Sequence, residues 1–550
     1  MSSVPLNEGE GSIAVGSTAV GSRAVGSKAE PPHRPDGLSE LAGWRANPLE
    51  QERLAKLARL EERGVCAYPA RVSRGQGCAE AAHAFEQFEA AGAEGEAPTV
   101  QVSGRIRRLN IKGKLSFLHI ADESGRLQLL ARLHTLGEER YSLIKEKLLD
   151  VDDFIAGSGP MMRTRAGEIS VDLRDLRLLS KALSPLPVIK QQQDEAGNII
   201  EHGAFADIET RYRRRYVDLA VNEEVREVFR QRAAIIARIR QFLDARGFLE
   251  VETPILQPLY GGAAARPFHT RHNQLKQELY LRISFELYLK RLLVGGYDAV
   301  YEIGRDFRNE GISWKHNPEF TMLEFYQAYI DYRGVMELCE AMVAAAAEGV
   351  FGGWNVSFRG KELNLKPPWR RITVREAIHE ACGLDYRQFA DAETLAAELT
   401  ARGEPPTPGQ PWGKMVEGLL GKYVEPALIQ PTFVIDYPRE ISPFAKRLPQ
   451  DDSHVERFEA FAGGMEIGNG FSELNDPREQ EARFREMAAL FQAEDDDNAP
   501  LDEDYLRALR YGMPPSGGFG LGIDRLVMLL TDQRSIRDVL LYPHLREVPR

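Results

Sequence analysis

The sequence predicts a protein of the α+β class, in which a small closed β-barrel precedes a larger domain of antiparallel strands and helices. Three observations predict this class. Short strands separated by turns fill residues 98 to 182, and two further strands with period-two alternation flank a charged loop between residues 301 and 326. A chain of 550 residues is too long for one hydrophobic core, so we expect two or three domains.

Composition and charge exclude several classes of protein. No apolar run approaches the roughly 20 residues of a membrane span, and the N-terminus lacks a secretory signal, so we expect a cytoplasmic protein without a membrane partner. Four cysteines lie far apart without a CxxC pair, which argues against a zinc knuckle or a disulfide framework. A net charge of -12 means that any nucleic-acid contact must come from a local basic patch.

The first 97 residues form two expected regions. Residues 1–40 carry the small-residue repeat AVGSTAVGSRAVGSK followed by prolines, which predicts a disordered extension. Residues 41–97 form an N-terminal helical region. Its first helix is expected to begin with Asn47 as the cap and Pro48 at the first helical position, and to end at Gly64.

Residues 98–182 are expected to form the barrel. Five strands with one helix near residues 139 to 149 suit a closed barrel of the OB type. Phe117 and Gln128 fall on neighbouring strands beside a basic first hairpin, which contains Arg105, Arg107, Arg108, Lys112 and Lys114. Cations for phosphates beside an aromatic ring for a base are typical of single-stranded nucleic-acid binding. A solvated basic face is the alternative.

The remaining chain begins with a polar linker at 183–220 and continues as one large domain at 221–550. A helix from about 222 to 246 is expected to end at Gly247, and the following FLEVETPILQP is expected to be a strand closed by Pro254. The amphipathic helix and this strand are consistent with either internal core or a subunit interface.

The stretch 301–326 is expected to form an antiparallel hairpin with a loop at 309–318. Alternation places Glu302, Asp306 and Arg308 on one face and Tyr301 and other apolar residues on the opposite face. Desolvated charges in the middle of a sheet need partners, which favours a binding site. An ordinary solvated hairpin is the alternative, and the stretch by itself does not decide between the two.

Three features follow the hairpin. Residues 384–430 are expected to form a helical insert. Glu459 and Glu466 face each other across a Gly463-Gly464 turn, where two carboxylates would either bind magnesium or remain exposed. Spaced glycines in SGGFGLGIDR precede a helix that carries Arg525 in its first turn, an arrangement that permits close approach of an anion and is weak evidence by itself.

In combination, these segments resemble a known family. GFLEVETPILQP, FRNEGISWKHNPEF and GFGLGIDR, in this order behind the barrel, resemble the three motifs of class II aminoacyl-tRNA synthetases. GGAAARPF, ELYLKR and EIGNGFSELND narrow the resemblance to the lysyl-tRNA synthetases of bacterial type. It covers residues from about 47 to 545 and implies a class II catalytic domain with an antiparallel sheet flanked by helices, behind an OB-fold anticodon-binding domain.

The resemblance implies an ATP-dependent ligase that activates L-lysine and transfers it to lysine tRNA. Arg308 and Arg525 would be catalytic. The positions implied to bind ATP are Arg308, Glu310, His316, Phe320 and Arg525, and those implied to bind Mg²⁺ are Glu459 and Glu466. Such chemistry needs positioning and charge neutralisation rather than a covalent nucleophile. A homodimer is also implied.

The resemblance further assigns a pocket for the amino acid and a surface for the anticodon. Lysine would contact Gly262, Glu286, Glu324, Tyr326, Asn469, Phe471 and Glu473. The anticodon would contact Phe117, Gln128 and Glu168. Two departures from the family pattern stand beside these sites, namely Leu109 with Asn110, and Ser284 with Phe285.

Three alternatives remain open. The chain could be a paralogue that lysylates a protein, although such relatives resemble the catalytic domain alone. It could also be another synthetase of the aspartate and asparagine group, or a tRNA-binding protein without catalytic activity. The lysine-family residues argue against the second, and the intact ATP-site residues argue against the third.

Overall fold

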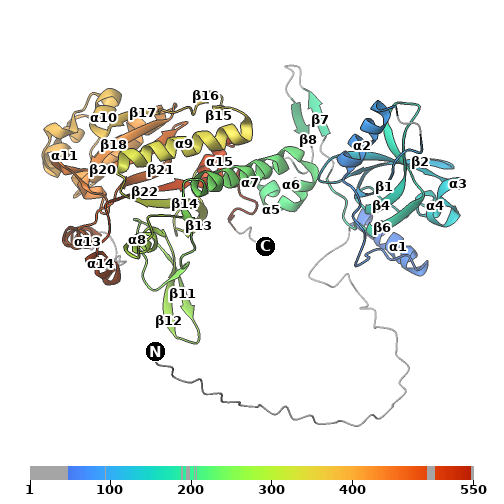
Figure 1. Cartoon of the computed structure of the whole chain (residues 1–550), viewed down its shortest axis with the longest axis horizontal. Coiled ribbons are helices and arrows are strands. Elements are labelled where there is room, and N and C mark those ends of the chain that lie inside the picture. The colour runs from blue at the N-terminus through green and yellow to red at the C-terminus, as the bar shows by residue number, and fades with distance from the viewer. Residues whose placement is uncertain are drawn as a thin grey trace, which may run out of the picture. The chain divides into compact units, whose positions relative to one another are not determined.

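The computed structural model describes residues 47–92, 95–187, 190–193, 199–202, 205, 207–491 and 502–546. Its chain divides into two compact units, one up to Pro185 and one from Leu186 onwards (Figure 1). The predicted α+β class is confirmed. The repeat-bearing segment 1–40 lies outside the described residues. Among the residues that are described, no helix combines the length and apolarity needed to cross a membrane.

A closed barrel forms the first unit. Its strands are β1 (Thr99–Lys112), β2 (Leu115–Ala121), β3 (Arg126–Arg132), β4 (Phe154–Arg163), β5 (Ile169–Asp172) and β6 (Asp175–Ser180). The barrel closes because β1 pairs antiparallel with both β2 and β4. The last predicted strand is divided into β5 and β6 because the chain changes partner there: Leu173 donates its backbone N–H to Leu130, and Arg174 donates to Ser158.

Four helices belong to this unit: α1 (Pro48–Glu62), α2 (Cys78–Ala90), α3 (Leu133–Leu136) and α4 (Glu138–Lys145). The side chain of Asn47 accepts the backbone N–H of Glu50 at 3.0 Å, so the predicted cap is confirmed. Leu60 and Phe85 from the first two helices are buried in the same core as the barrel residue Ile120. The N-terminal helices and the barrel therefore share one hydrophobic core.

A large sheet organises the second unit. Its strand order is β17-β18-β20-β21-β22-β14-β13-β9, and β19 pairs with β20. The bounds are β9 (Leu249–Glu250), β13 (Ala299–Phe307), β14 (Glu319–Ala328), β17 (Arg370–Thr373), β18 (Thr432–Pro438), β19 (Arg447–Leu448), β20 (Asp451–Ala462), β21 (Met465–Ser472) and β22 (Ser516–Gly522). The inner pairings are antiparallel, and the outermost pairs at each end are parallel. Outside this sheet lie β7 (Lys190–Gln193), β8 (Ile199–His202), β15 (Asn355–Phe358) and β16 (Lys361–Asn364).

The predicted hairpin is confirmed as β13 and β14. Glu302 lies opposite Glu324, and Asp306 lies opposite Phe320, so the polar residues of both strands share one face. Leu323 and Phe325 are fully buried on the other face. The period-two pattern thus separates a site face from a core face.

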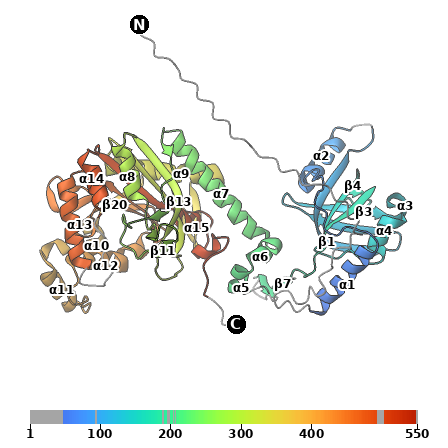
Figure 2. The same ribbon diagram turned by 90° about the horizontal axis from the view of Figure 1, so that it is seen from below.

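Helices cover both faces of the sheet. The core face is packed by α7 (Glu223–Asp244), α9 (Tyr332–Phe351) and α15 (Ile523–Leu530), and α7 and α9 lie side by side (Figures 1 and 2). Near the site face are α8 (Glu286–Val294), α10 (Val374–Cys382), α11 (Ala392–Ala401), α12 (Trp412–Leu419) and α14 (Glu503–Arg510). The remaining helices are α5 (Ile208–Arg213), α6 (Arg215–Val221) and α13 (Pro477–Phe491).

A row of aromatic rings crosses the core face and ties neighbouring strands together. Phe325 of β14 lies 5.5 Å from the ring of Phe248 and 5.7 Å from that of Phe519 on β22. Phe519 continues the row to Phe458 on β20 at 5.7 Å, and Phe458 continues it to Phe433 on β18 at 5.2 Å. These contacts hold the strands that carry the site in register.

The expected strand at 248–254 is wrong in its extent. Only Leu249–Glu250 forms β9, and the chain then leaves the large sheet. Pro254 has no N–H to donate to a sheet, and the N–H of Thr253 donates to the side chain of Glu302 at 3.1 Å instead. The chain continues as β10 (Leu256–Gln257), which pairs with β12 (Gln277–Leu281), itself paired with β11 (Phe268–His272).

The Phe325→Ala substitution tests the aromatic row. We expect it to lower the free energy of unfolding by about 3–5 kcal/mol, because a fully buried ring with two aromatic neighbours is removed. Urea denaturation followed by circular dichroism measures the change. Tyr511→Ala, at a residue that is 82% exposed, is the control and should change stability by less than about 0.5 kcal/mol. Equal effects of both substitutions would contradict the role of the row.

Candidate active site

A cavity of about 950 Å³ opens beside the polar face of the hairpin. Strands β14, β21 and β22, the start of α8 and the insert segment 407–411 all contribute to its wall. The structure places most of the predicted residues here: Gly262, Glu286, Arg308, Glu310, His316, Phe320, Glu324, Tyr326, Glu466, Asn469, Phe471 and Arg525. Segments distant in sequence therefore converge on one cavity.

Arg308 stands immediately after β13. Its backbone N–H donates to Pro318 across the base of the loop at 2.8 Å, and its Nε donates to the carbonyl of Ile283 at 3.3 Å. The guanidinium carbon lies 5.1 Å from the centroid of the Phe320 ring. The carbonyl of Ile283 therefore holds one edge of the Arg308 guanidinium, and the guanidinium stacks on the ring of Phe320. The same side chain lines the cavity.

A buried ionic cluster supports the strand that carries Arg308. Arg282, 2% exposed, pairs with Glu302 at 2.6 Å and with Asp306 at 3.3 Å. Burial raises the pKa of Asp306 to about 7, and the two guanidiniums of Arg282 and Arg308 oppose this rise. Arg282 therefore supplies a partner within the chain for the two acidic residues of β13.

Three buried carboxylates surround the expected amino-acid pocket. Glu286, Glu324 and Glu473 are 6%, 6% and 1% exposed. Burial raises the pKa of each, to about 8 for Glu473. The hydroxyl of Tyr326 donates to Glu324 at 3.0 Å, and so does the hydroxyl of Ser284, also at 3.0 Å. Ser284, one of the departures from the family pattern, therefore acts as a donor to a pocket carboxylate.

Glycines form part of the pocket surface because side chains would not fit there. A Cβ at Gly518 would overlap the carboxylate of Glu473 and the ring of Tyr326. Gly262 has a φ of +86°, and a Cβ there would lie 3.0 Å from Oγ of Ser284. Glu473 adjoins Gly518 but is not among the residues that line the cavity, and neither is Glu459.

The loop at 309–318 is tied to other segments at several points. The carbonyl of Trp314 accepts the N–H of Ile536 at 2.8 Å, and Lys315 forms an ion pair with Glu425 of the insert. Arg525 contacts Nε2 of His316 at 3.1 Å. Burial and the charge of Arg525 lower the pKa of His316 to about 4, so its imidazole is neutral at pH 7.

Glu459 and Glu466 each meet an arginine. Arg457 pairs with Glu459 at 2.7 Å, and Arg525 pairs with Glu466 at 2.9 Å. Burial raises the pKa of Glu459 to about 7, and the neighbouring charge of Glu466 adds to this rise. Burial also acts to raise the pKa of Glu466, but Arg525 lowers it below its ordinary value. Glu459 and Glu466 thus provide two neighbouring carboxylates as oxygen donors. The described part of the chain contains no group of three or more acidic, histidine or cysteine residues that could hold a metal ion.

The barrel carries a separate polar face. Gln128 donates to Glu168, and Nε2 of His119 lies 3.0 Å from Glu168 and 3.2 Å from Gln128. Phe117 lies on the same strand as His119, two residues away, with Asn110 directly opposite it. The three expected anticodon residues therefore lie on the adjacent strands β2 and β3 and at the start of β5. His119 of β2 contacts two of them.

Four residues of these surfaces were not predicted as site residues. Arg457 donates to Asn469 at 2.9 Å and so joins it to Glu459. Its position two residues before Glu459 on one strand face was a usable signal. The spacing of two other residues would also have indicated them. Lys290 follows Glu286 by one helical turn, which places both on one helix face, and His119 follows Phe117 by two residues, which places both on one strand face. Ser284 had none beyond its departure from the family pattern.

Comparison with known proteins identifies relatives that match most of the chain. The family model described as tRNA synthetases class II (D, K and N) matches residues 207–546. A lysine–tRNA ligase from Chloroflexus aurantiacus is 49% identical over 504 residues, which cover 91% of this chain and 99% of the relative. The lysine–tRNA ligase of Roseiflexus castenholzii is 50% identical over 91% of this chain and 99% of its own length. That of Dehalococcoides mccartyi is 46% identical over 91% and 97%.

The Gly518→Ala substitution tests the glycine surface. We expect it to lower the free energy of unfolding by about 1–3 kcal/mol, because the added methyl group overlaps Glu473 and Tyr326. The midpoint of urea denaturation measures this loss. Gly520→Ala is the matched control on the same strand, since the nearest atom to its Cβ would be the flexible end of Met322 at 3.3 Å, and the next contacts, with Glu324 and Asn469, are at 3.6 Å and 3.9 Å. A larger loss at Gly520 than at Gly518 would contradict the assigned geometry.

Proposed function

Because the chain belongs to the class II lysyl-tRNA synthetases, a family of ATP-dependent ligases, we propose that its cavity activates lysine and transfers it to lysine tRNA. The observation that carries this proposal is the group of three buried carboxylates beside Tyr326, at a pocket bordered by Arg308. Buried negative charge selects a long cationic side chain, whereas a pocket for aspartate or asparagine would need hydrogen-bond donors.

The first half-reaction needs alignment and neutralisation of charge. A carboxylate oxygen of lysine attacks the α-phosphorus of ATP, the bond to the β-phosphate breaks, and pyrophosphate leaves. Arg308 is proposed to contact both the lysine carboxylate and the α-phosphate, because its planar guanidinium can donate two parallel hydrogen bonds. In the second step, a hydroxyl of the terminal adenosine of the tRNA attacks the carbonyl carbon of the adenylate, and AMP leaves.

Lysine is proposed to lie along β14 and β21. Glu473 and Tyr326 receive its ε-ammonium group, and Glu286, Glu324 and the backbone at Gly262 receive its α-amino group. Asn469 and Phe471 form the remaining wall. The burial of these carboxylates supports this assignment, because a desolvated carboxylate gains most from a cationic ligand.

The adenine ring is proposed to lie between Phe320 and Arg525, with Glu310 accepting from its amino group. His316, neutral at pH 7, contacts the phosphates as a hydrogen-bond partner rather than as a cation. Arg525 pairs with Glu466 through the edge of its guanidinium, an interaction that is compatible with stacking of the guanidinium face on adenine.

Glu459 and Glu466 are proposed to hold the magnesium ion that accompanies ATP. Their hard oxygen donors suit Mg²⁺, and the raised pKa of Glu459 indicates a charge that a nearby cation would stabilise. Phosphate oxygens and water would complete the coordination. When bound, the ion supplies charge neutralisation on the phosphates.

The barrel, residues 98–182, is proposed to bind the anticodon. Phe117 stacks on a base, and Gln128 and Glu168 hydrogen-bond to bases. Leu109 packs against the barrel core, so it makes no charged contact, whereas Arg108 is exposed on the same strand and can meet a phosphate. The relatives match across this barrel as well, which argues against a paralogue that lysylates proteins.

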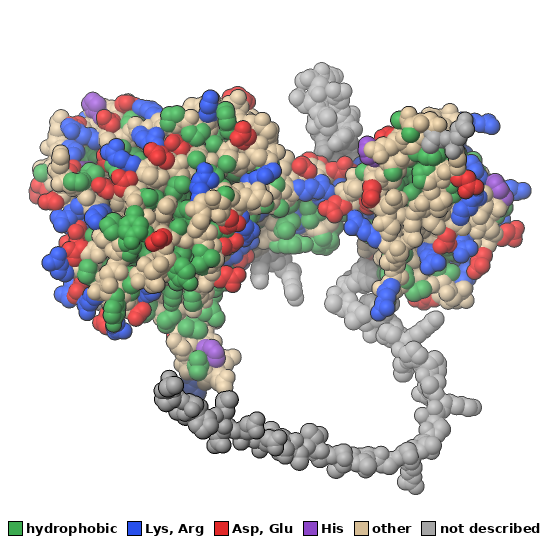
Figure 3. Space-filling view, in the orientation of Figure 1, with side chains coloured by type: hydrophobic (Ala, Val, Ile, Leu, Met, Phe, Trp, Pro, Cys, Tyr) green, Lys and Arg blue, Asp and Glu red, His purple; other side chains and the backbone are tan. Residues whose placement is uncertain are grey.

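We further propose a homodimer in the cytoplasm. Ile255, Leu256 and Leu259 are 43%, 49% and 37% exposed at the start of the segment that continues into β11 and β12. Hydrophobic side chains gather near the base of this hairpin (Figure 3). An exposed apolar patch of this kind is typical of an interface, and a second copy of the chain is its proposed occupant.

Amino-acid-dependent exchange of pyrophosphate into ATP tests the activity. We expect exchange with lysine to exceed that with each other standard amino acid, because only lysine places a second ammonium group among the buried carboxylates. Transfer to lysine tRNA is then measured with labelled lysine. Exchange with aspartate or asparagine above that with lysine would overturn the proposal.

The Phe117→Ala substitution tests whether the barrel acts in tRNA binding and not in the activation of lysine. We expect it to raise the KM for tRNA in aminoacylation about tenfold, since base stacking contributes about 1–3 kcal/mol. Exchange, which needs no tRNA, should keep its rate. Phe154→Ala, at an exposed aromatic residue of the same barrel, is the control. A matching decrease in exchange would exclude a purely anticodon-binding role for Phe117.

A further inference from the structure

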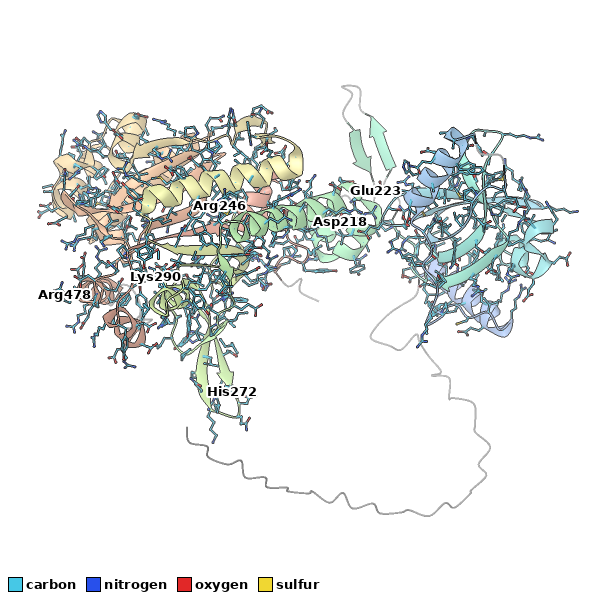
Figure 4. All side chains as sticks on the ribbon, viewed as in Figure 1. Asp218, Glu223, Arg246, His272, Lys290 and Arg478 are labelled. Carbon is cyan, nitrogen blue, oxygen red and sulfur yellow. The ribbon has the colours of Figure 1, made fainter. Side chains whose placement is uncertain are left out.

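Lys290 is a fully buried cation beside the proposed lysine pocket. It lies on α8, one turn after Glu286, and its side chain is 0% exposed (Figure 4). Removing an ammonium group from water costs several kcal/mol unless its partners are close and well placed. Such a residue therefore requires an explanation beyond the packing of a helix.

The ammonium group bridges two carboxylates that we assign to opposite ends of the substrate. Nζ lies 2.5 Å from Oε1 of Glu286 and forms an ion pair with Glu473. Aromatic rings surround the same group, with Nζ 4.9 Å from the centroid of Phe444 and 5.1 Å from that of Phe471. The rings exclude water, so the electrostatic effect of each charge extends further than in solvent.

We propose that Lys290 is a positioning residue that determines specificity for lysine by setting the net charge of the pocket. This inference rests on the proposed function. In the complex with lysine, the ammonium groups of the substrate favour the ionised forms of Glu286, Glu324 and Glu473, and Lys290 offsets one of these three negative charges. The two remaining charges match the two ammonium groups of lysine, while Arg308 receives the substrate carboxylate.

The surrounding titratable groups are consistent with this balance. Burial alone would lower the pKa of Lys290, but Glu286 and Glu473 outweigh it and raise that pKa, so the side chain stays charged. The same ammonium lowers the pKa of Glu286 and Glu473 against the effect of burial. The other groups that face this cluster are Glu324 and Tyr326 of β14, Asp306 of β13, Tyr505 of α14 and Arg457 of β20.

Removal of Lys290 should therefore add to the protons that the empty pocket holds. Lys290 lowers the pKa of Glu286 and Glu473 against the effect of burial, so both pKa values rise further without it and more of the carboxyl groups are neutral near pH 7. A neutral carboxyl attracts the ammonium group of lysine less strongly, and binding of lysine must then release the proton.

The test compares Lys290→Met with the wild-type enzyme. At pH 7 we expect the KM for lysine in pyrophosphate exchange to rise about tenfold or more, the effect of about one pKa unit, while the KM for ATP changes less than about twofold. Raising the pH to about 9 favours ionisation of the pocket carboxyls while the ε-ammonium of free lysine, pKa about 10.4, stays charged. Deprotonation of the α-amino group affects both enzymes alike, so the difference in KM between the variant and the wild type should decrease.

A second measurement counts protons directly. Titration calorimetry with lysine in two buffers of different ionisation enthalpy gives the number of protons released on binding, which we expect to be larger for the variant than for the wild type. Lys290→Gln removes the charge but keeps a hydrogen-bond donor, and it should behave like Lys290→Met. Leu293→Met, at a buried position one turn further along α8, controls for repacking of the helix.

The outcomes are distinguishable. If the wild-type enzyme gives no lysine-dependent exchange, the proposed function fails. If the wild type is active but both charge-removing variants keep its lysine KM and its proton release, the charge-setting role of Lys290 is overturned and the proposed function stands. A KM for lysine that rises equally in Leu293→Met, or fails to recover at pH 9, would likewise assign Lys290 a packing role only.

Discussion

The structure depends on the need of buried carboxylates for cations. Glu302 and Asp306 meet Arg282, Glu459 meets Arg457, and Glu286 and Glu473 meet Lys290. Arg282 and Lys290 each reach a partner on another strand or at its end, so those pairs form only in the folded chain. Arg457 and Glu459 lie on the same strand, and Arg457 also donates to Asn469 on the neighbouring strand. Because an unpaired buried charge costs several kcal/mol, the same interactions that form the site also constrain the arrangement of α8, β13, β20 and β21.

The sequence predicted the parts of the fold that depend on local alternation. Period two in β13 and β14 identified both the hairpin and its two faces, because one face packs on aromatic residues and the other on charges. The same reasoning failed at 248–254. There the apolar residues suggested a longer strand, but Pro254 cannot donate to a ladder and Glu302 takes the N–H of Thr253. A contact with a residue 49 positions away cannot be seen in a local pattern.

The candidate site was predictable to the extent that its residues lie in recognisable motifs. Arg308, Phe320 and Arg525 were found this way, and the structure places them around one cavity. Ser284, Arg457 and Lys290 were missed because they act on other side chains. The contacts of Arg457 with Glu459 and of Lys290 with Glu286 are local, but those with Asn469 and Glu473 appear only when the strands and helices are assembled. The contribution of the insert, whose segment 407–411 lines the cavity, was hidden for the same reason.

The glycines of β22 limit how the specificity of this site could diverge. At Gly518 the pocket surface consists of backbone, with no side chain that a mutation could shorten, so substitution can only reduce the space beside Tyr326 and Glu473. Enlargement or a change of polarity would have to come from the surrounding positions, such as Ser284 or Tyr326. Evolution toward a different amino acid would therefore proceed by exchanging the side chains of the walls while this strand stays as it is.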